Sequence, residues 1–530
     1  MNIDSSDILI FNREGQSALS SIGERGFRST LITNDLQLTS AYLSKDEVEY
    51  YTQILDLNII ENLCFLGYKS AKYSFLNNEK YPLQRPRYGH EEIGDATPND
   101  RDALVTHTKR ILNRLQNVNG CKRYYNIEVP FAKAIYYLTS NGVHVSKSKV
   151  YDFLNTSPHT HNKILNALSI YGVVDESFDA LQNWCQNSTN KDFHNLYMRS
   201  FDDVYKNADI HPVFAIHKRL DKLKRTHSII RDLSAGEDRL YPKYKVIGTS
   251  TCRCTTFSPN LMGLPKEMRS LVIPSSPERG IVEIDYSQME VGVMAALSGD
   301  ENLLFDFNSG DVYVKLAEFL EVNRDKAKQI FLSIINGASV RTLTRWLGGN
   351  DISVTEDILK AFFSRYSQLR KYLGDLEKRG QQYCYATSYD GLRRFVYRDS
   401  NYVPREARNW EKNWFKNFPI QSSASAIFKY SIIQLADQID PKEYSILVPL
   451  YDSVVFEAPQ DRIPFYTEIT ERCMIGAMKK AFPFLEPKVD VNDIDISCWN
   501  SPKTSLNLAD FLGNPLKDLK LKERKRRLFD

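Results

Sequence analysis

The sequence predicts an α+β protein in which one strand-rich unit is built from two segments that lie far apart in the chain. From Lys245 to Ser298 the pattern is rich in strands and turns, and a strand pattern returns from Tyr444 to Phe456. The residues between these two segments, and those from about 121 to 245, have mostly helical patterns. A long helical insertion therefore divides the strand-rich unit.

Composition describes an ordinary globular chain of several domains. A chain of 530 residues is too long for one core and should form about three or four domains. Hydrophobic residues make up 42% and charged residues 25%, with no apolar run long enough for a membrane span and no secretory pattern. The eight cysteines are scattered, which is typical of reduced thiols. We therefore expect a cytoplasmic protein without a membrane partner.

The segment Val282–Glu290 has the most informative pattern of the chain. A β-prone run ends at Asp285, and Glu290 follows where the pattern turns helical. A second aspartate, Asp452, lies between the β-like runs 444–450 and 454–456, which predict a hairpin. Aspartates at the ends of two strands can hold two divalent cations, the usual arrangement for in-line phosphoryl transfer.

The charge distribution supports a phosphate-binding partner, although the net charge is only +3. Basic residues gather at 217–226, at 393–394, at 405–412 and at 520–527, which favours a track for a nucleic-acid backbone. All nine histidines lie at or before His227. A histidine base near the two aspartates is therefore excluded, and with it Ser/His/Asp chemistry.

Several short motifs occur in the same order as in family A DNA polymerases, the bacterial DNA polymerase I type. Asp285–Glu290 (DYSQME) resembles the first signature of that family, DYSQIE. Arg324–Gly337 is similar to the fingers-helix signature R-x3-K-x7-YG, and Tyr451-Asp452-Ser453 resembles HDE. Weaker matches support this resemblance. Thr251–Arg253 resembles TGR, Ser258–Leu261 resembles DPNL, and Asn417–Gln421 resembles NxPxQ. Leu220–Lys224 resembles a thumb-to-palm segment, and Glu128–Pro130 with Asn141–Val143 resembles the start of the polymerase region. The resemblance covers about residues 121 to 500.

The resemblance implies a right-hand polymerase fold of palm, fingers and thumb. The domains it implies are a shortened exonuclease-like α/β domain at 1–120, the thumb at 121–245, the palm at 246–298 and 413–500, the fingers at 299–412, and a basic tail at 501–530. Asn12 stands where an exonuclease needs its first aspartate, so we expect no proofreading. No flap nuclease domain is expected. The basic tail is an expected disordered segment or, alternatively, a DNA-binding arm or a peptide that binds a sliding clamp, which is a processivity factor. The resemblance also implies the cytoplasm of a bacterial cell or a phage-infected host.

The resemblance also assigns the chemistry to particular residues. Asp285 and Asp452, with the backbone carbonyl of Tyr286, are expected to hold two Mg²⁺ ions, with Mn²⁺ as an alternative ion. Arg324 and Lys328 stand one helical turn apart and can reach the nucleotide phosphates together. Lys328 is the expected general acid for the leaving pyrophosphate.

The remaining assignments concern the nucleotide and the DNA. Glu290 is expected to exclude a ribose 2′-hydroxyl, which favours dNTPs as substrates. Other residues expected near the nucleotide are Gln288, Tyr313 and Leu332. Arg253 and Gln421 are expected to contact minor-groove acceptors that all base pairs share. Further residues expected along the primer-template DNA are Asn417, Lys224, Arg225, Asn260, Asn336, Gly337 and Arg393.

Departures from the family pattern leave the catalytic aspartates intact. Leu332 replaces a usual aromatic residue, Asn336 replaces the Tyr of the YG pair, and Ser453 replaces the Glu of HDE. We therefore expect an active DNA polymerase with altered fidelity, in phage or plasmid replication or in repair or lesion bypass. Two alternatives stay open, a single-subunit RNA polymerase, which Glu290 disfavours, and a catalytically weak or silent DNA-binding scaffold.

Overall fold

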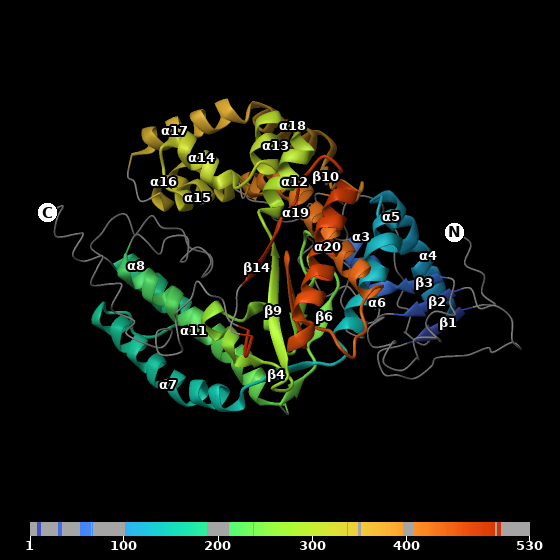
Figure 1. Cartoon of the computed structure of the whole chain (residues 1–530). Helices are drawn as coiled ribbons and strands as arrows, with labels where there is room; N and C mark the ends of the chain where they lie inside the picture. Colours follow the sequence, from blue (N-terminus) through green and yellow to red (C-terminus); the bar gives the residue numbers. More distant parts are fainter. Residues whose placement is uncertain are drawn as a thin grey trace, which may run out of the picture.

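The computed structural model describes residues 8–11, 30–33, 53–64, 66, 101–187, 211–236, 238–335, 338–347, 351–395, 407–492 and 496–499. At its centre is an antiparallel sheet in the order β12-β13-β9-β14 (Figure 1). Its strands are β9 (Arg279–Tyr286), β12 (Ser445–Leu450), β13 (Ser453–Pro459) and β14 (Val489–Asn492). β9 comes from the first strand-rich segment and lies between β13 and β14 of the second. The predicted hairpin and the divided strand unit are both confirmed.

The two faces of the sheet pack against different groups of elements. Alternation along β9 sends Val282 and Ile284 into a core shared with helices α12 (Met289–Ser298), α19 (Ala407–Ala436) and α20 (Ile463–Ala481). Ile281 points to the opposite face, into a core that includes residues of a separate helical pair. The β9 residues that follow Ile281 at period two, Glu283 and Asp285, therefore belong to that second face.

Helices between the two strand segments are drawn above the sheet in Figure 1, and their buried residues continue the core of β9, α12 and α19. They are α13 (Glu301–Asn308), α14 (Val312–Leu320), α15 (Arg324–Ile335), α16 (Val340–Trp346), α17 (Ile352–Arg365) and α18 (Ser367–Tyr383). The buried Phe331 ring centres their core, with centroids 5.7 Å from Tyr313, 5.0 Å from Phe362 and 5.8 Å from Tyr366. The helical insertion that the sequence predicts is confirmed.

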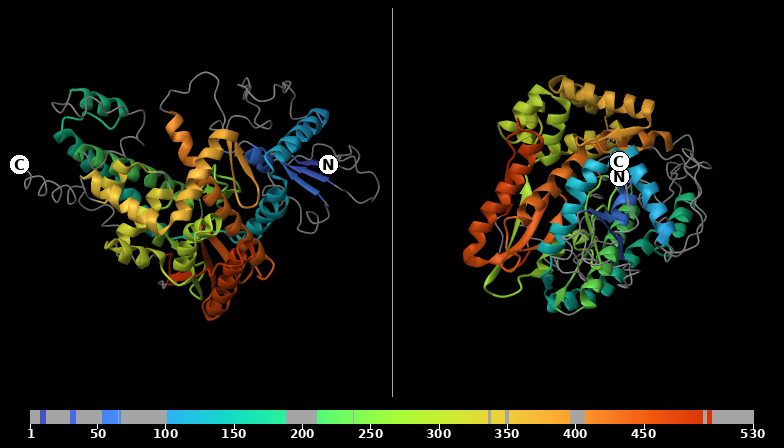
Figure 2. Two further views of the ribbon diagram at one scale, coloured as in Figure 1. Left: turned by 90° about the horizontal axis from the view of Figure 1, so that it is seen from above. Right: turned by 90° about the vertical axis from the view of Figure 1, so that its right-hand side faces the viewer.

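A pair of long helices, α7 (Lys147–Ile170) and α11 (Pro212–Ser234), lies on the other side of the sheet (Figures 1 and 2). The short α8 (Phe178–Asn187) joins them through apolar contacts. The preceding elements α5 (Cys121–Arg123), η1 (Tyr124–Glu128) and α6 (Val129–Leu138) instead pack against α19. Residues 121–138 thus support the central body, and the helical pair starts after them.

The described part of residues 1–120 forms a small α/β unit. Strands β1 (Ile8–Phe11), β2 (Thr30–Thr33) and β3 (Gln53–Asp56) are parallel, and α3 (Leu57–Cys64) and α4 (Arg101–Asn117) accompany them. Tyr124 anchors this unit, since its hydroxyl accepts a 2.7 Å hydrogen bond from the Asp56 amide. Asn12 and the basic tail 501–530 lie outside the described residues.

Short strands complete the fold. They are β4 (Val143–Val145), β5 (Arg239–Leu240), β6 (Lys243–Lys245), β7 (Thr255–Phe257), β8 (Val272–Ile273), β10 (Tyr385–Thr387) and β11 (Arg393–Phe395). All eight cysteines are free thiols, as predicted. Among the described helices, none combines the length and apolar character that crossing a membrane requires.

Candidate active site

The two predicted aspartates meet at the end of the central sheet. Asp285 is the penultimate residue of β9 and pairs in register with Ser453, the first residue of β13. Asp452 precedes that serine in the hairpin turn, where Tyr451 takes a left-handed backbone conformation (φ 60°). The Tyr286 amide donates a 3.1 Å hydrogen bond to the Asp452 carbonyl, which fixes the turn against β9. Asp285 is therefore held by a strand, and Asp452 by a turn that is hydrogen-bonded to that strand.

The electrostatics of this pair suit a bound cation. Burial, and then the charges of Asp452 and Glu283, raise the pKa of Asp285 above its ordinary value. Burial likewise raises the pKa of Asp452, against the opposing effect of Arg253. The Oδ1 atom of Asp285 is buried and accepts no hydrogen bond from any described residue. Half-buried carboxylates that repel each other are stabilised by a divalent cation between them, so the residues present fit Mg²⁺.

The aspartates do not form a complete metal site by themselves. No three histidine, cysteine or acidic side chains in the described ranges gather closely enough to hold a metal ion. Further ligands must come from backbone oxygens, water or substrate. The Tyr286 side chain points away, since its buried hydroxyl donates to the Met474 carbonyl at 2.5 Å. Only the backbone of Tyr286 is therefore left to contribute an oxygen.

An ion pair lies beside the aspartates. The Arg253 guanidinium binds the Glu290 carboxylate, and it also lies over the Tyr451 ring at 5.4 Å from the centroid. Glu290 is in the first turn of α12, which begins after Gln288. Glu290, which is expected to exclude a ribose hydroxyl, is thus held in place by Arg253, which is expected to contact the minor groove.

Two cations project from helix α15 around one aromatic ring. Arg324 and Lys328 are both exposed, and their charged groups lie 5.6 and 5.9 Å from the centre of the Tyr313 ring. The Asp311 carboxylate accepts hydrogen bonds from Nε of Arg324 at 2.8 Å and from its Nη2 at 2.7 Å. Lys328 is close enough to Asp285 to lower the pKa of that aspartate.

Gln288 links the two halves of the site. It takes a left-handed conformation (φ 57°) at the start of α12, and its side-chain oxygen accepts a 3.0 Å hydrogen bond from the Val312 amide. Val312 is the first residue of α14, which carries Tyr313. The segment that follows β9 is therefore hydrogen-bonded directly to α14, which carries a residue expected near the nucleotide.

Comparison with known proteins identifies the family. The model of DNA polymerase family A matches residues 176–492, which is more than half of the chain. The chain belongs to DNA polymerase family A. DNA polymerase I of Caldicellulosiruptor bescii is 23% identical over 418 residues, which are 71% of this chain and 47% of that protein. DNA polymerase I of Bacillus subtilis is 28% identical over 324 residues, 56% of this chain and 36% of that protein.

A solved structure supports the family A fold. The polymerase domain of Pol1 from M. smegmatis, in complex with a DNA primer-template and a dNTP, has a TM-score of 0.72. The match covers 90% of this chain and 88% of that chain at 18% sequence identity. The right-hand polymerase fold predicted from the sequence is confirmed. The chain spans about half or less of the length of the two DNA polymerase I proteins.

The other predicted DNA contacts among the described residues are distributed over α19, α11, β11 and the turn at Asn260. Asn417 and Gln421 stand one turn apart on α19, and the buried Oδ1 of Asn417 accepts no hydrogen bond within the described structure. The Asn260 side chain caps the turn Leu261–Gly263 by accepting a 3.0 Å bond from the Gly263 amide. Asn260 therefore shapes its own loop in addition to any DNA contact.

Three predicted cations already have protein partners in this state. Lys224 pairs with Glu176 at 2.6 Å, Arg225 pairs with Asp221, and the Arg393 guanidinium lies 5.0 Å from the centre of the Tyr385 ring. Leu332 lies one turn beyond Lys328 on α15 and is half-buried. Asn336 and Gly337 lie outside the described residues, so their predicted roles near the template stay predictions.

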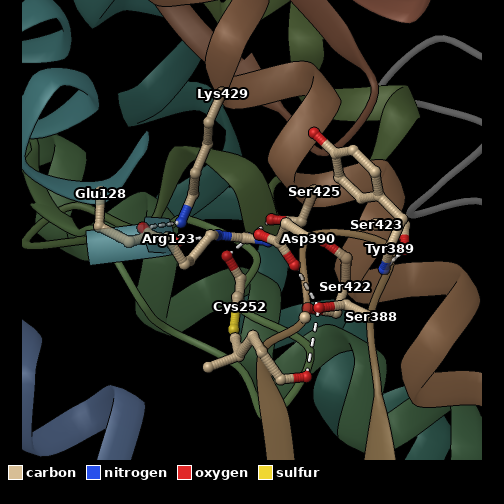
Figure 3. Close-up of polar contacts among 12 residues, drawn as sticks. Arg123, Glu128, Cys252, Ser388, Tyr389, Asp390, Ser422, Ser423, Ser425 and Lys429 are labelled. Atoms are coloured by element: carbon tan, nitrogen blue, oxygen red, sulfur yellow. Dashed lines mark hydrogen bonds and ion pairs between the residues drawn. The ribbon is translucent and has the colours of Figure 1, made fainter. Parts of the chain in front are cut away.

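A buried charge cluster supports the site, and the sequence patterns did not predict it (Figure 3). Arg123 contacts Glu128 at 2.6 Å and Asp390 at 3.0 Å, and Lys429 contacts Glu128 at 2.5 Å. Arg123 also donates to the Ser422 carbonyl at 3.1 Å. Ser422 follows Gln421, so the cluster fixes the part of α19 that carries this residue.

The same helix supports Arg253. The Ser425 hydroxyl donates a 2.7 Å hydrogen bond to the carbonyl of Cys252, the residue before Arg253. Pairs of buried charges that satisfy each other hold a geometry firmly, because breaking one leaves an uncompensated charge. The charge cluster thus holds the backbone next to Gln421, and Ser425 holds the backbone next to Arg253. Both residues are expected to contact the minor groove.

Proposed function

We propose that this chain is a DNA-directed DNA polymerase, a nucleotidyltransferase that extends a primer 3′ end from dNTPs on a DNA template. One observation carries the proposal. Two half-buried aspartates, one at the end of β9 and one in the adjoining hairpin turn, face a helix that presents two exposed cations, and one oxygen of Asp285 is buried without a hydrogen bond from a described residue. That combination suits a metal-bound polyphosphate and a hydroxyl nucleophile.

Asp285 and Asp452 would hold the divalent cations, with the Tyr286 carbonyl as a further ligand. Two Mg²⁺ ions, or Mn²⁺ in their place, lower the pKa of a primer 3′-hydroxyl and neutralise the triphosphate when bound. The protein contributes the fixed spacing of the two carboxylates, since the hydrogen bond from the Tyr286 amide to the Asp452 carbonyl ties the turn to β9.

The two basic side chains of α15 act on the triphosphate. Arg324 binds its phosphates, and Lys328 protonates the leaving pyrophosphate. An incoming triphosphate competes with Asp311 for Arg324, and binding of the nucleotide therefore releases that ion pair. Lys328 makes no ion pair with a described residue, so its ammonium group can approach the pyrophosphate and donate a proton. The Tyr313 ring keeps both cations on one side of the helix.

Primer-template DNA and dNTPs are the proposed partners, and a processivity factor is a further proposed partner. Arg253 and Gln421 test the shape of the base pair from the minor groove, while Lys224 and Arg225 bind the phosphate backbone. Replication of a phage or plasmid genome and lesion repair both suit this activity. A catalytically silent scaffold is disfavoured, because Asp285, Asp452, Arg324 and Lys328 are all present.

The choice of sugar separates a DNA polymerase from an RNA polymerase. We expect the wild-type chain to extend a labelled primer with dNTPs and Mg²⁺ and to discriminate strongly against rNTPs. The Glu290→Ala variant removes the carboxylate that clashes with a 2′-hydroxyl. Its ratio of kcat/KM for rNTP to that for dNTP should rise by about 10²-fold, which corresponds to about 2.7 kcal/mol.

Glu318→Ala is the matched control for that measurement, since Glu318 is an exposed glutamate of the neighbouring helix α14. It should leave the sugar preference unchanged. Faster extension with rNTPs than with dNTPs by the wild-type chain would support the RNA polymerase instead. Unchanged sugar selectivity in Glu290→Ala would remove Glu290 from this role.

A further inference from the structure

A third carboxylate lies beside the aspartate pair and was not among the predicted site residues. Glu283 precedes Asp285 by two residues on β9, so both side chains belong to the same face of the sheet. Only 5% of Glu283 is exposed. A charged side chain buried to this degree requires a specific reason, because its desolvation is costly.

Glu283 is held from two directions. Its Oε2 atom accepts a 2.7 Å hydrogen bond from the indole of Trp499. Arg269 lies 3.3 Å from the same oxygen and 4.5 Å from the centre of the Trp499 ring. The Ser453 hydroxyl lies 3.4 Å from Oε1 of Glu283 and 3.3 Å from the Leu450 carbonyl, and its single proton can be donated to either oxygen. The carboxylate therefore has a fixed position next to the first residue of β13.

Ser453 is one of the positions at which this chain departs from its family. The family motif HDE has a glutamate there, after the aspartate that corresponds to Asp452. In this chain the serine pairs in register with Asp285, and it is 2% exposed. The acidic group missing at position 453 of β13 thus reappears on the adjacent strand β9, within hydrogen-bond distance of the serine.

We propose that Glu283 is a positioning residue of the metal site and supplies, from β9, the negative charge that the family carries at position 453. This inference rests on the proposed polymerase function. Glu283 contributes charge and orientation and is not itself a ligand, in agreement with the lack of a ready-made three-ligand cluster among the described residues. Groups of this kind orient the direct ligands and tune their affinity for the metal.

The electrostatics agree with this role. Glu283 is among the charges that raise the pKa of Asp285, after burial and Asp452, and it also raises the pKa of Asp452. It therefore adds to the negative potential that attracts a divalent cation to both aspartates.

Glu457 provides a matched comparison within the same sheet. It is 4% exposed, it pairs with Arg279 at 3.3 Å, and it accepts hydrogen bonds from Ser275. Its register partner is Ile281, four residues along β9 from Asp285. Glu457 thus resembles Glu283 in burial and in its arginine partner, but it lies away from the aspartates.

The test measures Mn²⁺ binding to the metal-free full-length chain by electron paramagnetic resonance, without DNA or nucleotide. We expect Glu283→Gln to weaken Mn²⁺ affinity by about 10- to 100-fold, as for other groups that support metal ligands. Glu457→Gln should bind Mn²⁺ as the wild type does. Moving the charge back, in Glu283→Gln/Ser453→Glu, should restore affinity to within a few-fold of the wild type.

Further outcomes separate the inference from the polymerase function. Wild-type affinity in Glu283→Gln, with primer extension by the wild-type chain intact, would overturn the inference and leave the function standing. Restoration by Glu283→Gln/Arg269→Met would also overturn it, because Glu283 would then serve only to neutralise Arg269. Absence of both Mn²⁺ binding and primer extension in the wild type would contradict the function itself. Thermal denaturation of each variant identifies any that fail to fold, and the double variant Glu283→Gln/Ser453→Glu then decides.

Discussion

Replacing Asp285 by asparagine is expected to lower the single-turnover rate of nucleotide addition by about 10⁴-fold, which corresponds to about 5.4 kcal/mol. The side chain keeps its size and its place at the end of β9, but it loses the charge that binds a cation. Asp285 Oδ1 is buried without a hydrogen bond among the described residues, so the amide gains no partner that could compensate. The measurement is rapid-quench extension of a labelled primer by one dNTP.

The thermal stability of Asp285→Asn shows whether the variant lost only catalysis or also its folded structure. The pKa of Asp285 in the folded state is raised above its ordinary value of 3.8, so the folded state holds the proton more tightly than the unfolded state does. That contribution to stability is present at low pH and is lost as pH rises through the raised pKa. Metal-free Asp285→Asn should therefore melt about 2 °C or more above wild type at pH 8, and at the same temperature near pH 3.

Adding Mg²⁺ at pH 8 should reverse the order of the two melting temperatures, so that the wild type melts above Asp285→Asn. A cation that binds only the folded state stabilises it in proportion to its occupancy, and wild type should gain Tm on addition of Mg²⁺ while Asp285→Asn gains little. A variant that melts well below wild type at pH 8 would indicate a structural role for the aspartate. Rapid extension by a folded Asp285→Asn chain would contradict the two-metal proposal.

Replacing Lys328 by methionine is expected to lower kcat by about 10²- to 10⁴-fold, the usual effect of removing a general acid. The ammonium group lies beside the Tyr313 ring, makes no ion pair with a described residue and acts electrostatically on Asp285. Lys326→Met, on the same helix but two residues away on a different face, is the control and should keep full activity.

An arginine at position 328 separates proton donation from phosphate binding. A guanidinium keeps the charge but does not release a proton at accessible pH. Lys328→Arg should therefore retain the KM for dNTP and lose most of kcat. Full kcat in Lys328→Arg would show that the charge alone is required, and an unchanged Lys328→Met would remove the residue from the mechanism.

The sequence predicted the elements whose signal is local. The β9 strand, the 445–459 hairpin and the start of α12 all follow from residue periodicity. The order of the motifs predicted that Asp285 and Asp452 lie together although they are far apart in the sequence. Arg324 and Lys328 are on one helix face because they are four residues apart. These features needed no knowledge of long-range contacts.

The supporting contacts could not be predicted in this way. Arg123 and Asp390 are 267 positions apart in the sequence, and Lys429 and Glu128 are 301 positions apart. Residue periodicity reports only local structure, so it cannot predict either pair. Glu283 appeared to be an ordinary residue of a strand until the fold placed Ser453 and Trp499 beside it. The replacement of HDE by Tyr451-Asp452-Ser453 was the one available signal, and only the fold connects it to β9.

The measurement that tests the central claim most directly offers the wild-type chain one dNTP at a time. Four primer-templates differ only in the first templating base, and each is incubated with Mg²⁺ and a single dNTP. The account predicts extension by one nucleotide when the dNTP is complementary, with much slower addition of the other three and none in the presence of a chelator. Absence of extension on all four templates, or addition that ignores the templating base, would contradict it.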